Sequence, residues 1–283
     1  MKTSTSKRLR WNVAIWLAAG LFMTSTAGMA SGPILPDPKA EARHQPQVEE
    51  TANGISLVNI TAPSSGGVSR NEYETFNVPD KGAILNNSYT LSKTELAGYV
   101  QGNNNMAERP AKIIVNEVTG TGSTSMDGFL EVAGNRADVV IANPNGITVN
   151  GGGFINTGKA FLTTGKPVYD GEDHLQRFDI TGGDILIEGK GLGGKETGSL
   201  AILSRAVKIN AGIWAKDLHI TTGANTVDAK TLEASAIEGK GERPAFALDT
   251  AAIGGMYAGR ITLVGTEKGL GVNNSGTWSA EDN

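Results

Sequence analysis

The sequence contains no cysteine among its 283 residues, and aromatic residues make up only 6% of it. The absence of cysteine excludes a disulfide framework, a thiol nucleophile and a metal site with cysteine ligands. Because hydrophobic residues still reach 39%, a core must be built mainly from Val, Ile, Leu and Ala. Proline is also scarce, with 10 residues against 38 glycines, and the glycines lack the strict period of collagen. This composition favours a folded backbone with many sharp turns.

Residue patterns typical of catalysis are also missing. The three histidines, His44, His174 and His219, lie far apart and lack the spacing of metal ligands. No G-x-S-x-G motif occurs, and nothing indicates a nucleophile with its base. Acidic groups such as Asp170, Glu172 and Asp173 are interpreted as solvated loop charges. We therefore expect no catalytic residue, no metal and no cofactor, and a chain that is not an enzyme.

One glycine-rich segment, GKGLGGKE at residues 189–196, resembles a phosphate-binding loop. A P-loop continues with Ser or Thr after its lysine, whereas here Glu196 follows Lys195 and would repel a phosphate. The dinucleotide fingerprint must open a helix, but the following residues have the pattern of a strand. We interpret the segment as a solvated corner between strands.

The N-terminus has the three parts of a secretory signal peptide. A basic region is followed by the apolar run 11–23, and Gly28-Met29-Ala30 offers small residues for cleavage. A membrane anchor is the alternative, but the run is short for a span and is interrupted by Asn12 and Gly20. We predict a signal peptide over residues 1–30, cleaved after Ala30.

Cleavage there would change the charge balance of the chain. Four of the 25 basic residues and none of the 29 acidic residues precede position 31, so 21 basic residues would remain and the net charge would be −8. An acidic chain of this kind argues against nucleic acid as a partner. An exported protein of the bacterial periplasm or cell surface fits the signal peptide and the absence of cysteine.

The rest of the chain divides by composition. Residues 31–50 carry four prolines and little apolar surface, and we expect an extended leader there. From Ile55 onward, short runs rich in Val and Ile each end at Asn, Gly or Asp, which is the pattern of strands and turns. Helical signals are weak: residues 90–100 are the best candidate, for one or two turns, and residues 228–238 fit a helix, a loop or a strand.

The spacing of two strands favours a solenoid. Residues 185–187 and 207–209 are apolar strand patterns 22 residues apart, near one coil of a three-sided parallel β-helix. Such coils bury their inner faces only by stacking on one another. A β-sandwich remains open on this pattern alone.

A dense apolar segment at residues 137–142 leads into Asn143-Pro144-Asn145-Gly146. Proline fixes φ and Asn-Gly tolerates positive φ, so this tetrapeptide predicts a tight turn after a buried strand. The turn alone accounts for these residues physically, whether or not they also contact a partner.

Many segments in order resemble the N-terminal secretion domain of two-partner secretion exoproteins, the filamentous-haemagglutinin-like proteins, with contact-dependent growth inhibition exoproteins and large adhesins the most similar. The segments that carry this resemblance are TANGISLVNI (51–60), VSRNEYETFNV (68–78), GAILNNS (82–88), LAGYVQGNNNM (96–106), IIVNEV (113–118), LEVAGNRADVVIANPNGI (130–147), GGFINTG (152–158) and LTTGKP (162–167). The resemblance implies an all-β fold, a right-handed parallel β-helix with an N-terminal cap and extra-helical β-hairpins.

The resemblance also implies a function and partners. Such a domain would cross the inner membrane by the Sec machinery and be recognised by the periplasmic POTRA-type domains of a dedicated outer-membrane β-barrel transporter. It would then reach the cell surface as a monomer, without enzymatic activity and without a cofactor. The alternative is a surface β-helix that binds or cleaves polysaccharide. Adhesin and growth-inhibition toxin both remain open for the full-length protein.

Two family motifs map onto this chain. The first corresponds to Asn103, Asn104, Asn105 and Met106, where Asn104 and Met106 replace the usual proline and leucine. The second, Asn143, Pro144, Asn145, Gly146 and Ile147, is intact. The resemblance makes both motifs candidates for transporter recognition, and both are also expected to form structural turns.

The resemblance also sets the predicted boundaries. We expect the secretion domain over residues 51–270. Residues 271–283 resemble the opening of haemagglutinin-type repeats, which indicates a truncated array.

Overall fold

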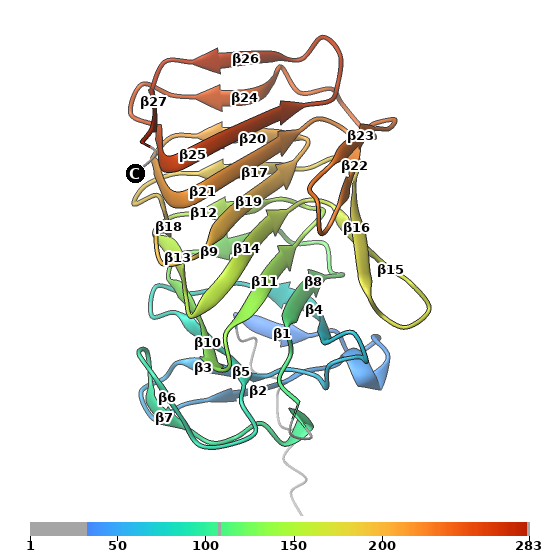
Figure 1. The fold of residues 1–283 in the computed structure, drawn as a ribbon, viewed down its shortest axis with the longest axis vertical. Helices are drawn as coiled ribbons and strands as arrows, with labels where there is room; N and C mark the ends of the chain where they lie inside the picture. Colours follow the sequence, from blue (N-terminus) through green and yellow to red (C-terminus); the bar gives the residue numbers. More distant parts are fainter. Residues whose placement is uncertain (1–32, 107–108, 282–283) are drawn as a thin grey trace, which may run out of the picture. The chain divides into compact units, whose positions relative to one another are not determined.

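The computed structural model describes residues 33–106 and 109–281. Contacts divide the chain into two units, Met1–Ser31 and Gly32–Asn283, and the described residues belong to the second. The predicted signal peptide, with its cleavage site at Ala30, lies outside the described residues. Within the second unit, strands stack in parallel coils with three faces (Figure 1). The expected all-β parallel β-helix is therefore confirmed.

Each face is a column of parallel strands, one strand for each coil. The first column is β4 (Val68–Phe76), β8 (Ile113–Val118), β11 (Ala137–Ala142), β14 (Thr157–Thr163), β19 (Ser199–Ser204), β21 (Gly212–Thr222) and β25 (Gly255–Gly265). The second is β3 (Ser56–Asn59), β5 (Ala83–Asn87), β10 (Phe129–Gly134), β13 (Gly152–Ile155), β18 (Leu192–Gly194), the first halves of β21 and β25, and β27 (Thr277–Ala280). The third is β9 (Thr124–Met126), β12 (Ile147–Val149), β17 (Asp184–Ile187), β20 (Ala206–Ile209), β24 (Phe246–Thr250) and β26 (Gly271–Asn274).

The register between coils agrees with the spacing in the sequence. Ile185 lies beside Val207 and Ile187 beside Ile209, so the 22-residue interval is one coil. The interval from Ile147 to Ile185 is longer because a hairpin is inserted between these two coils. Alternation along each strand directs every second side chain inward, as strand geometry requires.

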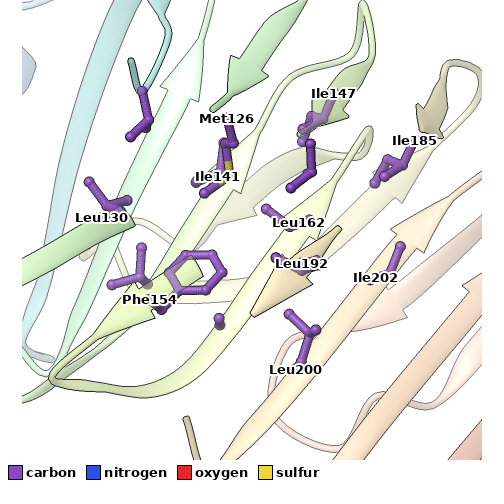
Figure 2. Packing of buried hydrophobic residues seen from close by; sticks show 14 of the residues in the cluster. Met126, Leu130, Ile141, Ile147, Phe154, Leu162, Ile185, Leu192, Leu200 and Ile202 are labelled. Atoms are coloured by element: carbon purple, nitrogen blue, oxygen red, sulfur yellow. The ribbon is translucent and has the colours of Figure 1, made fainter. Parts of the chain in front are cut away.

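The interior of the coils is filled by aliphatic side chains. Figure 2 shows the central part of this core, where side chains from all three faces meet; it includes Met126, Leu130, Ile141, Ile147, Phe154, Leu162, Ile185, Leu192, Leu200 and Ile202. All of these are at most 2% exposed. A narrow interior of stacked aliphatic residues explains why so few aromatic residues suffice.

The apolar run at residues 139–142 is buried on both faces of its strand. Val139 and Ile141 point into the coil, whereas Val140 lies beneath an extra-helical sheet that contributes Phe178 and Val227. That sheet consists of β15 (Lys166–Tyr169), β16 (Leu175–Ile180), β22 (Asn225–Asp228) and β23 (Ala234–Ala236) (Figure 1). A strand covered on both sides needs apolar residues at consecutive positions, as this one has.

The segment 31–50, expected as an extended leader, contributes two strands to the folded unit. β1 (Ile34–Pro36) pairs with β4, and β2 (Gln47–Glu50) pairs with β3, both in antiparallel orientation. A 3-10 turn, η1 (Ala42–His44), lies between them. The two strands occupy the ends of the large sheet and cover its edges, which would otherwise expose unpaired backbone groups.

The prediction of a helix at residues 90–100 is wrong. This segment forms a hairpin of β6 (Ser92–Thr94) and β7 (Gly98–Val100). Gly98 adopts a φ of +71°, and the Thr94 hydroxyl donates to its carbonyl at 2.8 Å. The Glu131 carboxylate of the neighbouring coil accepts the backbone N–H groups of Glu95 and Leu96. These tertiary contacts outweigh the weak helical propensity.

Candidate functional site

The intact motif forms the corner between β11 and β12. Asn143 is fully buried, and its Nδ2 donates to the Gly122 carbonyl at 2.9 Å and to the Thr124 hydroxyl at 3.0 Å. Its Oδ1 accepts the backbone N–H of Asn145 at 2.9 Å, which closes an Asx turn. The single side chain of Asn143 therefore shapes its own corner and fixes it to the preceding coil.

The other residues of this motif complete the corner. Asn145 Nδ2 donates to the Gly120 carbonyl at 2.9 Å, which is a second link to the preceding coil. Gly146 has a φ of +108°, a conformation that side chains disfavour, and its N–H donates to the Asn143 carbonyl. Ile147 is 2% exposed and begins β12. Backbone groups that would be left unpaired at the corner are thus satisfied.

The divergent motif uses the same hydrogen bonds. Asn103 is 2% exposed, and its Nδ2 donates to the carbonyls of Ile60 and Asn86, each at 2.9 Å. Its Oδ1 accepts the N–H of Asn105 at 3.0 Å, and Asn105 Nδ2 reaches the Ile60 carbonyl at 3.1 Å. Met106 is fully buried at the end of η2 (Asn104–Met106). Loss of the usual proline has left the asparagine clamp intact.

Asn104 occupies the place that Pro144 has in the other motif, since each lies between two asparagines that share the same hydrogen bonds. We expect Asn104→Pro to fold and to stay within about 1 kcal/mol of the wild type in free energy of unfolding, because proline here restricts mainly the unfolded chain. Urea unfolding at equilibrium measures this. A loss well beyond that range would show that the two turns differ in backbone geometry.

The two motifs do not form a joint site. Each clamp bonds to its own preceding coil, and among the described residues no hydrogen bond joins one motif to the other. Asn103 and Asn143 are buried, so their side chains are not offered to a partner once the coils have formed. Asn104, Pro144 and Asn145 remain exposed. In the folded domain both motifs are structural turns.

Sequence reasoning missed a set of polar and charged side chains, all buried or partly buried except the exposed Arg43, that we name the cap cluster. It comprises Arg43, His44, Arg70, Glu72, Glu117, Tyr169 and Asp173. At its centre Arg70 of β4 contacts Glu72 Oε1 at 2.8 Å and Glu117 Oε2 of β8 at 3.5 Å. Glu72 and Glu117 are neighbours in the parallel register, and a single guanidinium lies between both carboxylates.

Distant segments meet at the cap cluster. From the N-terminal turn, His44 Nδ1 lies 3.1 Å from Glu72 Oε1, and Arg43 contacts Asp173 of the β15–β16 hairpin at 2.6 Å. From the same hairpin, the Tyr169 ring lies 4.4 Å from the Arg70 guanidinium carbon, a cation–π contact. The cluster thereby ties the N-terminal cap and the hairpin to the first coils.

Burial shifts the titration of this cluster. Burial raises the pKa of the Glu117 carboxyl above its usual 4.5, and Arg70 opposes that shift. Burial also lowers the pKa of His44 below 6.5, and the positive charge of Arg70 adds to the effect. Arg70 Nε, Glu117 Oε2 and the Tyr169 hydroxyl are buried without a hydrogen bond. The cluster is costly to assemble, which makes it sensitive to the loss of any one partner.

Two expectations about this region are corrected. His44 was placed in an extended leader but is 4% exposed, and Asp173 was read as a solvated charge but pairs with Arg43. The available signal was in the strands themselves. Arg70, Glu72 and Glu117 lie within strands rather than in turns. A charged residue in a strand is either on a face open to water or paired with an opposite charge, so these three residues could have suggested an ion-pair cluster.

The solvated corner expected at residues 189–196 is only partly right, because residues 192–194 form the strand β18 and Leu192 is buried in the core. Gly189 and Gly191 have φ values of +55° and +79° between β17 and β18, and no helix follows them. Among residues 33–106 and 109–281, no three His, Asp or Glu side chains are placed to hold a metal ion. In the same part of the chain no helix has the length and apolar character needed to cross a membrane.

Known proteins match the chain over nearly its whole length. The model of the TPS secretion domain matches residues 33–283. The crystal structure of the filamentous hemagglutinin secretion domain superposes with a TM-score of 0.79 at 34% identity, covering 88% of this chain and 84% of that one. The family match therefore includes the cap strands before residue 51 and the last coil after residue 270.

Curated relatives are similar in sequence but much longer. "Toxin CdiA" of Yersinia pestis is 47% identical over 253 residues, which are 89% of this chain and 8% of that protein. "16S rRNA endonuclease CdiA" of Enterobacter cloacae is 47% identical over 249 residues, which are 87% of this chain and again 8% of that protein. The chain thus spans less than a tenth of the length of these relatives.

Proposed function

This chain belongs to the family of TPS secretion domains, and we propose that it directs a longer exoprotein through a cognate outer-membrane transporter to the cell surface. The observation that carries the proposal is the family match over residues 33–283, together with the shared fold of the filamentous hemagglutinin secretion domain. The chain itself acts without enzymatic chemistry. The matches give no support to a β-helix that binds or cleaves polysaccharide.

The fold suits export of an unfolded chain. Each coil contacts mainly its neighbours, so folding outside the cell can propagate from coil to coil. The absence of cysteine means that no disulfide can form in the periplasm and block the pore. The buried clamps of Asn103 and Asn143 form only when the coil before each has been built.

The finer assignments extend the same proposal. Residues 1–30 act as a signal peptide for the Sec machinery and are cleaved after Ala30. The transporter recognises the domain through periplasmic POTRA-type domains while the chain is unfolded, when both asparagine motifs are accessible. The exported domain is a monomer. Residues 271–283 belong to the haemagglutinin-type repeats, and their strands β26 and β27 stack on β24 and β25 of the preceding coil.

The longer protein is proposed to be an exoprotein of contact-dependent growth inhibition. This chain is 47% identical to a CdiA toxin and 34% identical to the filamentous hemagglutinin secretion domain. Toxin activity in that case belongs to sequence other than this secretion domain. An adhesin with the same secretion domain is the other candidate.

Export in the presence and absence of the transporter tests the proposal. The full chain is produced in a bacterium that lacks such transporters, with or without the cognate barrel protein. We expect the chain in the medium only when the barrel is present, and in the periplasm otherwise. Equal amounts in the medium without the barrel would overturn the proposal.

A further inference from the structure

A groove lies beside the first coils, away from the two asparagine motifs. It has a volume of about 670 Å³ and lies between the Pro63–Gly67 loop and the residues that lead into β8 and β11. Three cationic side chains line it, namely Arg109, Lys112 and Arg136, and all three are exposed. Among the described residues that line it, Asp138 is the one acidic side chain. The volume is in the range of pockets that hold a ligand of many atoms.

The arginines of this groove differ from the others in the described part of the chain. Six of the eight arginines there form ion pairs with acidic side chains, namely Arg43, Arg70, Arg177, Arg205, Arg243 and Arg260. Arg109 and Arg136 form none with the described residues, and both line the groove. Two guanidinium groups that form no ion pair with the described residues thus lie at one concave place, where burial raises the pKa of the Asp138 carboxyl and the charge of Arg136 opposes that shift.

Internal contacts leave most of this positive charge available. Asp138 Oδ1 already accepts the backbone N–H of Lys159 at 2.7 Å. Arg136 Nη2 donates to the Thr157 carbonyl at 2.7 Å and to the Glu196 carbonyl at 3.4 Å, which fixes the guanidinium in place while the donors on its other nitrogens remain. The Lys112 stem packs along Gly67, whose φ of +84° is one that side chains disfavour. The groove is thus a preorganised cationic surface.

We propose that this groove binds an extended acidic segment of a partner polypeptide. Guanidinium groups are suited to carboxylates, since their planar N–H fork matches the two oxygens. Arg109 and Arg136 precede the neighbouring strands β8 and β11, which lie about 4.8 Å apart, so their long side chains can contact carboxylates of the same extended peptide. A long polyanion would be repelled by the net negative charge of the rest of the chain.

Fluorescence anisotropy of the purified full chain with a labelled peptide tests this inference. The probe is an eight-residue peptide that alternates Glu and Thr, and its counterpart carries Gln in place of Glu. We expect binding of the Glu peptide only, weakened by salt. The Arg109→Gln/Lys112→Gln variant should bind about tenfold more weakly. Arg177→Gln/Lys93→Gln, which removes two exposed cations elsewhere, should bind as the wild type does.

Further variants and probes decide the remaining outcomes. Arg109→Glu/Lys112→Glu should lose the Glu peptide and gain binding of a peptide that alternates Lys and Thr, a result that misfolding would not produce. Equal weakening by the Arg177/Lys93 control, or no binding of the Glu peptide by the wild type, would overturn the inference. Binding of inorganic phosphate or anionic lipid vesicles in preference to the peptide would also overturn it. Peptide binding is measured on the purified chain and does not depend on export. A negative result would therefore overturn the groove assignment and leave the proposed secretion function untouched.

Discussion

Asn143→Ala is expected to abolish export and to lower the free energy of unfolding by about 2–4 kcal/mol. The substitution removes two donated hydrogen bonds and two accepted ones, and polar groups of the Gly122–Thr124 segment and of Asn145 lose Asn143 as their partner. Each buried polar group left without a hydrogen bond costs about 1–3 kcal/mol. Hydrogen bonds to water that enters the site reduce this cost. Urea unfolding and the amount of chain in the medium measure the two effects.

Asn135→Ala is the matched control for this prediction. Asn135 is an exposed asparagine whose side chain forms no hydrogen bond with the described residues, so its loss should change stability by no more than about 0.5 kcal/mol. Normal export and stability of Asn143→Ala would contradict the structural role assigned to the motif. Normal stability with failed export would instead point to direct recognition of Asn143 by the transporter in the unfolded chain.

Arg70→Met is expected to lower the free energy of unfolding by about 3–5 kcal/mol at neutral pH, because it leaves Glu72 and Glu117 facing each other without a counter-charge. It also removes the cation that lies against the Tyr169 ring and so loosens the hairpin. Methionine keeps much of the volume, so the effect is electrostatic rather than a cavity. Urea unfolding measures the loss, and limited proteolysis within residues 170–174 should become faster.

The pH dependence of the Arg70→Met loss follows from Glu117. Burial raises the pKa of this carboxyl, so its protonated form stabilises the folded state fully below about pH 4.5, and that stability is lost as pH rises through the folded pKa. Without Arg70 the folded pKa rises further, and the deficit of the variant should therefore be larger at pH 8 than at pH 5. A deficit that grows as the pH falls would contradict this account.

Arg177→Met is the control for the Arg70 substitution. Arg177 is an exposed residue of β16 that pairs with Asp179 on the same strand, with roughly half of its side chain in water. An exposed pair of this kind contributes at most about 1 kcal/mol. If both substitutions cost the same, the cap cluster would have no special role in stability.

The strands and corners followed from local patterns. Short runs of β-branched residues that end at Asn or Gly predicted the coils, and the 22-residue interval between residues 185 and 207 matched the register of neighbouring coils. Asn143-Pro144-Asn145-Gly146 predicted its turn because Pro fixes its own φ, whereas Gly146, which lacks a Cβ, can adopt the positive φ of +108° that the corner needs. Such features depend on a few consecutive residues, which is why a sequence alone reveals them.

Other features depended on residues far apart in the chain. Residues 90–100 formed a hairpin rather than a helix because Glu131 of another coil accepts its backbone N–H groups. The segment before residue 51 proved to be a cap because its strands complete the edges of β4 and β3. In each case the deciding contact came from a neighbouring coil, and short-range propensity was too weak to oppose it.

By itself the sequence determined an all-β fold with tight asparagine corners, and its ordered motifs identified a secretion domain and, through that resemblance, a β-helix. Only the tertiary structure decided which polar residues are buried, that His44, Arg70, Glu117 and Asp173 meet, and that Arg109 and Arg136 share one groove. The physical reason is that turn geometry acts within a few residues. Desolvation and ion pairing depend instead on three-dimensional neighbours, and stacking coils bring those together from more than a hundred residues apart in sequence.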